Sequence, residues 1–147
     1  MTVYELFENI HRFCAWYEID ASSCVIVMGA ALVLHGVRDT TPDIDIQVNA
    51  DTYRRVSDKR PEGSRSYTVA TGVEITSIPF HDTVVKMGYG GPVVLGGDVC
   101  VLGMLRIQPI PSILLTKIAM ARRKDVSDIA RIREFVPRDL STTPWLG

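Results

Sequence analysis

The sequence predicts an α+β fold in which helices flank a mixed β-sheet. Three observations support this class. The chain opens with apolar residues at helical spacing, its middle contains short strand patterns separated by short helices, and its end carries two further helical patterns.

The 147 residues fit one domain, since single cores of roughly 100 to 150 residues are common. The 46% of apolar residues and 22% of charged residues are typical of a globular protein. A formal net charge of −1 gives no global attraction to nucleic acid or anionic membrane, so any recognition of phosphate must be local. Cys14, Cys24 and Cys100 match neither a zinc ligand set nor a disulfide framework, which predicts reduced thiols.

The first helix is predicted over residues 2 to 18, where Leu6, Ile10 and Phe13 share one face. Polar residues such as Glu8 and Arg12 interrupt this segment and exclude the core of a signal peptide. No apolar run approaches the roughly 20 residues that a membrane span needs. We therefore expect a cytoplasmic protein without a membrane partner.

The core is predicted over residues 24 to 108. An apolar run over residues 24 to 28 ends at Gly29 and indicates a buried strand, and a short helix over residues 30 to 35 follows it, closed by Gly36. Residues 43 to 48 alternate strictly between polar and apolar, which predicts a strand with two different faces. A helix over residues 51 to 58 follows, with Asn49 or Asp51 as its N-cap.

The remaining elements are a hairpin, further strands and two helices. The hairpin is predicted around Thr71 and Gly72, from strands 66 to 69 and 73 to 78. Short strands are expected over residues 93 to 95, 99 to 102 and 104 to 107. The C-terminal helices, within residues 112 to 136, are expected over 112 to 123, capped by Ser112, and over 126 to 135, stopped by Pro137. The whole chain, residues 1 to 147, forms one domain in this scheme.

Asp43 and Asp45 are the first candidate functional residues. Two aspartates at positions i and i+2 of a strand project from the same face, about 6 to 7 Å apart at the backbone. Such a pair suits a hard cation such as Mg²⁺ or Mn²⁺, which accepts one or two carboxylates together with water and phosphate oxygens. The alternative is a solvated strand edge.

The turn at Gly29 is the second candidate. Strand, glycine and helix start follow one another over residues 27 to 30, and the free amide groups of a helix start favour a phosphate. The alternative is a tight turn without a ligand.

Taken in order, these segments resemble the nucleotidyltransferase superfamily that includes DNA polymerase beta. Its motif is a hydrophobic residue, Gly, Gly or Ser, and later Asp-x-Asp/Glu. The closest likeness is to small bacterial and phage-type members, including the minimal nucleotidyltransferases of toxin–antitoxin systems and AbiEii-like toxins. The resembling stretches are residues 28 to 36, 38 to 45, 114 to 121 and 124 to 129. Ala30 departs from the pattern, because the family usually has Gly or Ser there.

The resemblance implies roles for further residues. Glu74, in a hydrophobic-acid-hydrophobic pattern, would be a third carboxylate and the base for an attacking hydroxyl group, or otherwise an outward-facing strand residue. Amides near Gly29 and Ala30, together with Arg38 and Lys117, would contact the phosphates of the nucleotide. The alternatives are a surface arginine and a lysine that extends from a packed helix. For Asp125 and Asp128 we favour a structural role at the start of the last helix.

The expected activity is a Mg-dependent transfer of a nucleoside monophosphate from an NTP, ATP among them, to a hydroxyl group of an RNA, a protein or a small molecule. Near-neutral charge disfavours an extensive RNA interface. The alternative is a catalytically inactive module of the same fold that binds a nucleotide or a protein partner, in a toxin–antitoxin or phage-defence setting. A third expectation is that a protein partner or a second copy of the chain, in a homo-oligomer, completes the site.

Overall fold

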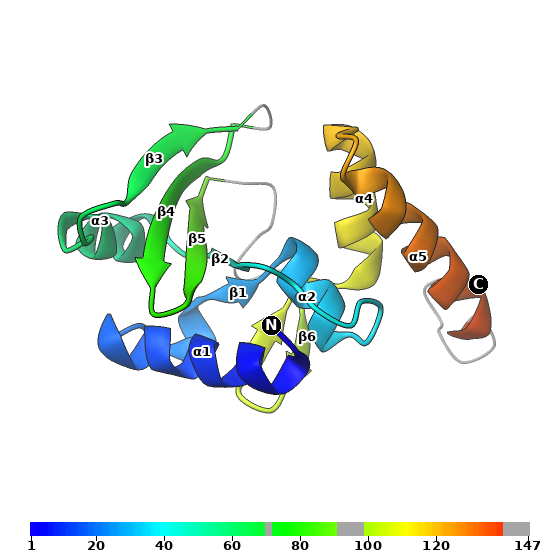
Figure 1. Cartoon of the computed structure of the whole chain (residues 1–147), viewed down its shortest axis with the longest axis horizontal. Coiled ribbons are helices and arrows are strands. Elements are labelled where there is room, and N and C mark those ends of the chain that lie inside the picture. Colours follow the sequence, from blue (N-terminus) through cyan, green and yellow to red (C-terminus); the bar gives the residue numbers. More distant parts are fainter. Residues whose placement is uncertain (70–71, 91–98, 140–147) are drawn as a thin grey trace.

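The computed structural model describes residues 1–69, 72–90 and 99–139. Within these residues seven strands form one sheet in the order β3-β4-β5-β2-β1-β7-β6 (Figure 1). β2 pairs with β5, and β1 with β7, in parallel, whereas the other pairs are antiparallel. The strands are β1 Val25–Ile26, β2 Ile44–Gln47, β3 Arg65–Thr68, β4 Glu74–Phe80, β5 Thr83–Tyr89, β6 Cys100–Leu102 and β7 Leu105–Ile107. The α+β class with a mixed sheet is confirmed.

Five α-helices accompany the sheet in the described residues. They are α1 Val3–Trp16, α2 Met28–Leu34, α3 Ala50–Asp58, α4 Ile110–Met120 and α5 Asp125–Asp139. The side chains of Thr2 and Asn49 cap α1 and α3, and Gly36, with φ of 81°, follows the end of α2. In Figure 1, α4 and α5 lie together at one end of the molecule, away from α1 and α3.

The core lies on one face of the strands, beneath α1 and α3. Phe13 of α1 packs edge-to-face on Phe80 of β4, with ring centroids 5.3 Å apart. On the same face of β4, Thr76 donates a hydrogen bond of 2.8 Å to the hydroxyl group of Tyr53 on α3. Because side chains alternate along a strand, the opposite face of β4, β5 and β2 is not covered by these helices. That opposite face carries the candidate site.

The main difference from the predicted elements is β5, which the sequence pattern did not reveal. The predicted strand over residues 93 to 95 lies outside the described residues. β1 is also shorter than expected, because Met28 already belongs to α2. Among the described residues, no helix is long and apolar enough to cross a membrane.

The predicted start of the first C-terminal helix, at Ser112, and the predicted end of the second, before Pro137, were both wrong. Pro109, not Ser112, is the N-cap of α4, and Pro111 lies in the first turn, where a missing N–H group costs nothing. α5 continues past Pro137 to Asp139. Pro137 therefore does not stop the helix at the preceding residue, although its missing N–H group removes one hydrogen bond.

Candidate functional site

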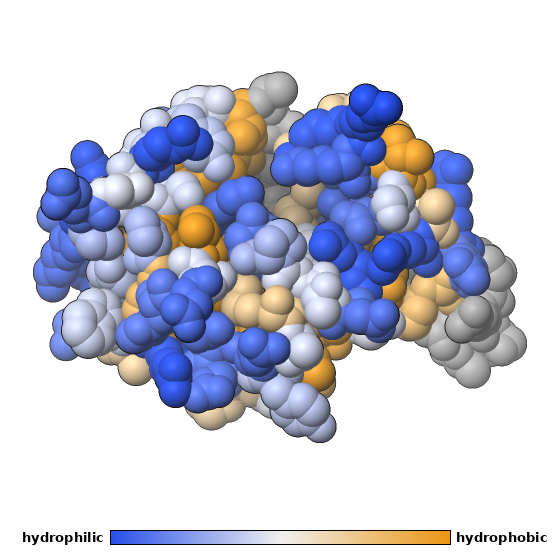
Figure 2. All heavy atoms as spheres, viewed as in Figure 1, coloured by the Kyte–Doolittle hydropathy of each residue, from blue (hydrophilic) through white to orange (hydrophobic). Residues whose placement is uncertain are grey.

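A cavity of about 620 Å³ opens on the uncovered face of the sheet. Its lining combines residues from β2 and β5, from the β3–β4 hairpin, and from α4 and α5. Figure 2 shows that the surface is hollowed between the strands on one side and α4 and α5 on the other. Mainly hydrophilic residues lie on the side of the two helices. The charged residues of the lining are Arg38, Asp43, Asp45, Lys86, Lys117, Arg122, Lys124, Asp125, Asp128 and Arg131. Charges of both signs therefore converge from segments far apart in the sequence.

Asp43 and Asp45 both line this cavity. The alternation of residues 43 to 48 explains their direction, because Ile44 and Ile46 are buried in the core on the other face of β2. The side chain of Asp43, just before β2, is 21% exposed. The structure thus brings together the two carboxylates that the sequence singled out.

Lys86 of β5 faces these aspartates. It lies opposite Asp45 in the register of the parallel β2–β5 pair, and its Nζ is 2.8 Å from Oδ2 of Asp43. Burial lowers the pKa of Lys86, but the hydrogen bond to Asp43 and the charges of both aspartates more than compensate, so the pKa is raised. The sequence analysis missed Lys86 because it missed β5. A single lysine within the apolar stretch 83–89 was the available signal.

Asp45 carries an unusual proton affinity. Burial and then the nearby charge of Asp43 raise its pKa to about 7, although Lys86, Lys117 and Lys124 act in the opposite direction. The protonated form of Asp45 is therefore favoured more than that of an ordinary aspartic acid side chain. Additional positive charge next to Asp45 would favour its ionised form.

Glu74 does not join the two aspartates. Ser77 of β4 pairs with Lys86, and Glu74 lies three residues before Ser77, so its side chain projects from the opposite face. Glu74 is exposed and does not line the cavity. Within the described parts of the chain, no cluster of three or more His, Cys, Asp or Glu side chains could hold a metal ion. A third carboxylate from Glu74 is thus absent from this arrangement.

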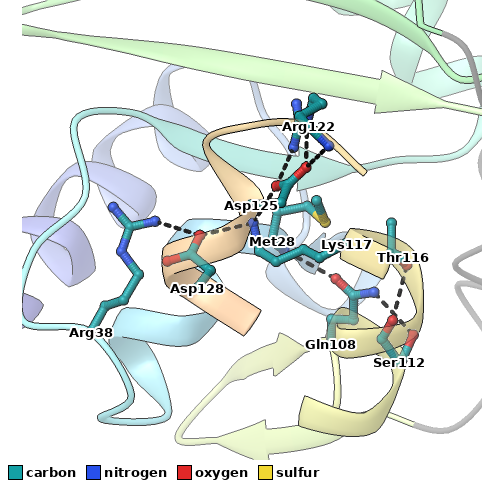
Figure 3. Close-up of polar contacts among 9 residues, drawn as sticks. All are labelled: Met28, Arg38, Gln108, Ser112, Thr116, Lys117, Arg122, Asp125 and Asp128. Carbon is teal, nitrogen blue, oxygen red and sulfur yellow. Dashed lines mark hydrogen bonds and ion pairs between the residues drawn. The ribbon is translucent and has the colours of Figure 1, made fainter. Parts of the chain in front are cut away.

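Lys117 lies in a buried network of ion pairs (Figure 3). Its Nζ is 3.1 Å from Asp125 and 2.9 Å from Asp128, and its side chain is only 4% exposed. Nη1 of Arg38 contacts the same oxygen of Asp128 at 3.2 Å, and Arg122 binds Asp125 through Nε at 2.8 Å. Hydrogen bonds from Arg122 and Lys117 outweigh the effect of burial and lower the pKa of Asp125 to about 2.

The network changes how the predicted phosphate contacts are understood. Arg38 and Lys117 do line the cavity, but both side chains are held by the carboxylates of α5. The same contacts place Asp125 and Asp128 in ion pairs that join α4, α5 and the loop after α2, a role different from the one at the helix start that we favoured for them. The cations of the lining with fewer constraints are Lys86, 29% exposed, and the exposed Lys124 and Arg131.

Gly29 lines the cavity, whereas Ala30 is fully buried in the core. A Cβ atom at position 29 would lie 2.9 Å from Nη1 of Arg38, so glycine leaves room for the guanidinium group. The preceding Met28 has a left-handed backbone (φ 55°), and its N–H donates to Oε1 of Gln108 at 3.0 Å (Figure 3). The first amide of α2 is thus already bonded to the protein.

Two oxygen ligands of the kind that Mg²⁺ prefers are available at Asp43 and Asp45, with water and phosphate oxygens completing its shell. These residues fit the ion, provided that Lys86 leaves Asp43 and that Asp45 is ionised. In comparisons with known proteins, the chain matches no protein-family model and no curated protein.

Proposed function

We propose that this protein is a nucleotidyltransferase that transfers a nucleoside monophosphate from an NTP to a hydroxyl group. One observation carries the proposal: Asp43 and Asp45 line a cavity of about 620 Å³ that also contains basic side chains from several other elements. Carboxylates for a metal ion and cations for phosphates are the two requirements of phosphoryl-group chemistry. The resemblance of residues 28 to 45 to the nucleotidyltransferase motif supports the same conclusion.

The cavity offers different surroundings for the parts of a nucleotide. The triphosphate would lie near Lys86 and Lys124, whose charges act on the aspartates. The β3–β4 hairpin supplies an apolar wall with one aromatic ring, through Tyr67, Val73 and Ile75. Such a wall suits a nucleobase, because stacking and apolar contact accept any planar base.

The chemistry follows from these positions. A hydroxyl oxygen of the acceptor forms a bond to the α-phosphorus, the bond from this phosphorus to the bridging oxygen breaks, and pyrophosphate leaves with the electron pair. A divalent cation, when bound, supplies Lewis acidity and charge neutralisation. Asp43 and Asp45 would hold it in their ionised forms. Because Glu74 projects from the other face, the proton of the acceptor is expected to pass to water in the open cavity.

A second candidate function is nucleotide binding without transfer. The specific observation in its favour is the pairing of Lys86 with Asp45 in the sheet, together with the position of Glu74 on the opposite face. Lys86 then occupies the strand position next to Asp45, from which a third carboxylate would otherwise help to bind a metal ion. In that case the protein would act as a nucleotide sensor or would present the site to a protein partner.

Thermal unfolding with each of the four NTPs, with and without Mg²⁺, tests whether the site binds a nucleotide. A ligand at about 100 times its dissociation constant should stabilise the fold by roughly 2.7 kcal/mol, a rise in Tm of several degrees. The doubly substituted Asp43→Asn/Asp45→Asn protein should lose the Mg-dependent part of this rise. Replacing the exposed Arg54 by Met serves as the control, because Arg54 lies outside the cavity lining.

Release of pyrophosphate separates the two candidates. The nucleotide that raises Tm is incubated with Mg²⁺ and either total RNA, the protein itself or aminoglycoside-type polyols, and pyrophosphate is measured. Release that depends on Asp43 and Asp45 supports the transferase. A rise in Tm without any release of pyrophosphate supports binding without transfer, and no rise with any NTP contradicts both candidates.

A further inference from the structure

Lys86 makes an ion pair in the place where the proposed metal site would form. We propose that Lys86 is a resident counter-ion that keeps a divalent cation off Asp43 until the phosphates of a nucleotide draw the ammonium group away. The inference rests on the proposed function, because it concerns the order in which ligands enter the same site. It predicts that metal ion and nucleotide bind together, and that the metal ion alone binds weakly.

The geometry sets up a direct competition. Nζ of Lys86 is 2.8 Å from Oδ2 of Asp43, close to the ideal length of a charge-assisted hydrogen bond. Mg²⁺ binds a carboxylate oxygen at roughly 2.0 to 2.1 Å. An ion on Asp43 would then lie within a few ångströms of the ammonium group, and the two positive charges would repel each other. One of them must leave.

Lys86 is the cation that is able to move. Its side chain is 29% exposed and projects into the cavity from the middle of β5. Lys117, in contrast, is 4% exposed and is fixed by two carboxylates, Asp125 and Asp128. A flexible lysine side chain can exchange a carboxylate for a phosphate oxygen of the ligand while keeping its charge paired. Asp43 would then be free to bind the metal ion.

The register of the sheet explains why the competition is built into the fold. Lys86 is opposite Asp45 on β2, and Ser77 of β4 is opposite Lys86 on its other side. All three side chains project from the same face, so no other acidic residue from these paired positions competes for the ammonium group. The two aspartates are therefore its nearest acidic partners in the strands.

Titration with Mn²⁺, followed by calorimetry and by the EPR signal of the free ion, tests the inference without any turnover. Wild type should bind Mn²⁺ weakly, Lys86→Met should bind it at least tenfold more tightly, and Lys86→Met/Asp43→Asn should lose that gain. Lys59→Met is the control, because Lys59 is exposed and lies outside the cavity lining, so its replacement removes one positive charge far from the aspartates. It should change the affinity by less than threefold.

Addition of a nucleoside triphosphate with a non-cleavable α–β linkage completes the test. It should raise the affinity of wild type for Mn²⁺ to that of Lys86→Met, and should have a much smaller effect on Lys86→Met. Equal affinity of wild type and Lys86→Met without nucleotide overturns the inference and leaves the proposed function intact. Failure of every variant to bind Mn²⁺, with or without nucleotide, overturns the metal site itself. Lys86→Gln provides a second variant if the Met protein is unstable.

Discussion

Asp45 gives the stability of the protein an unusual dependence on pH. Its pKa is raised to about 7 in the folded protein, whereas the ordinary value is 3.8. Between these two values the folded state binds more protons than the unfolded state, so this group lowers the free energy of unfolding as the pH rises. Its destabilising contribution is absent below about pH 4 and complete above about pH 7.

Replacing Asp45 by Asn should therefore stabilise the protein at high pH. At pH 8 the free energy of unfolding in urea should exceed that of wild type by up to about 4 kcal/mol, and the difference should approach zero near pH 4. Asp51→Asn is the control: its side chain is 97% exposed and lies outside the cavity lining, so its replacement should change the free energy of unfolding by less than about 1 kcal/mol. A variant Asp45→Asn that is less stable than wild type at pH 8 would contradict this account.

Gly29 is explained by the space that Arg38 requires. Alanine in a helix is favoured over glycine by roughly 1 kcal/mol, but a Cβ atom here would lie 2.9 Å from Nη1 of Arg38 and 3.4 Å from Oγ1 of Thr41. The methyl group would push the guanidinium group away from Asp128, to which it is bonded. When Arg38 is present, the substitution Gly29→Ala therefore has two opposing effects on stability: a gain in helix propensity and the loss of this ion pair.

A double-mutant cycle should reveal this opposition. Gly29→Ala should stabilise the Arg38→Ala protein by about 0.5 to 1 kcal/mol and should be neutral or destabilising in wild type, as measured by urea unfolding of all four proteins. Equal effects in the two backgrounds would show that Arg38 does not determine the need for glycine at this position.

At the scale of elements, the sequence located β2 but not its partner β5. The strict alternation of residues 43 to 48 depends only on neighbouring residues, so it gave both the strand and the direction of Asp43 and Asp45. β5 contains Lys86 and Gly88 among apolar residues, and its parallel pairing with β2 joins segments about 40 residues apart. No local pattern encodes that pairing.

The position of Glu74 was beyond local reasoning for a related reason. A strand was predicted where β4 lies, but the face that Glu74 occupies depends on register, and a shift of one residue would reverse it. The pairs Ser77–Lys86 and Asp45–Lys86 fix that register. The type of residue could be recognised from the sequence, whereas its face could not.

The β3–β4 hairpin leads to a prediction about which part of a bound nucleotide it contacts, the base or the phosphates. Tyr67 pairs with Ile75, so both project from the face that carries Lys86, and both line the cavity. If this wall holds a nucleobase, Tyr67→Ala should weaken NTP binding at least fivefold, since stacking contributes about 1 to 3 kcal/mol per base. The affinity for inorganic tripolyphosphate, which has no base, should change by less than twofold. Calorimetry with both ligands makes the comparison, and equal losses would contradict it.

At the scale of the whole molecule, the ion-pair network joins α4 and α5 to the loop after α2. Arg38 comes from the loop after α2, Lys117 from α4, and Asp125 and Asp128 from α5. The sequence predicted both C-terminal helices but not how they pack, so it could not show that Lys117 meets Asp125 and Asp128. A resemblance based on motifs assigned this lysine to a phosphate, whereas the folded chain pairs it internally.

Lys117→Met should therefore destabilise the fold strongly. It would leave the buried carboxylates of Asp125 and Asp128 with fewer cationic partners, and loss of one member of a buried ion pair costs about 3 to 5 kcal/mol. Urea unfolding of Lys117→Met measures this loss. Lys117→Met/Asp128→Asn should recover part of it, because Arg122 still binds Asp125 and no charge remains at position 128.

Arg54→Met provides the comparison that separates burial from charge. Arg54 is 3.3 Å from Asp51, but the two side chains are 73% and 97% exposed, so water already solvates both charges. Its replacement should change the free energy of unfolding by less than about 0.5 kcal/mol. If Lys117→Met cost no more than Arg54→Met, the network would not hold α4 and α5 together and against the loop after α2, and Lys117 would then be available for a phosphate as the motif implied.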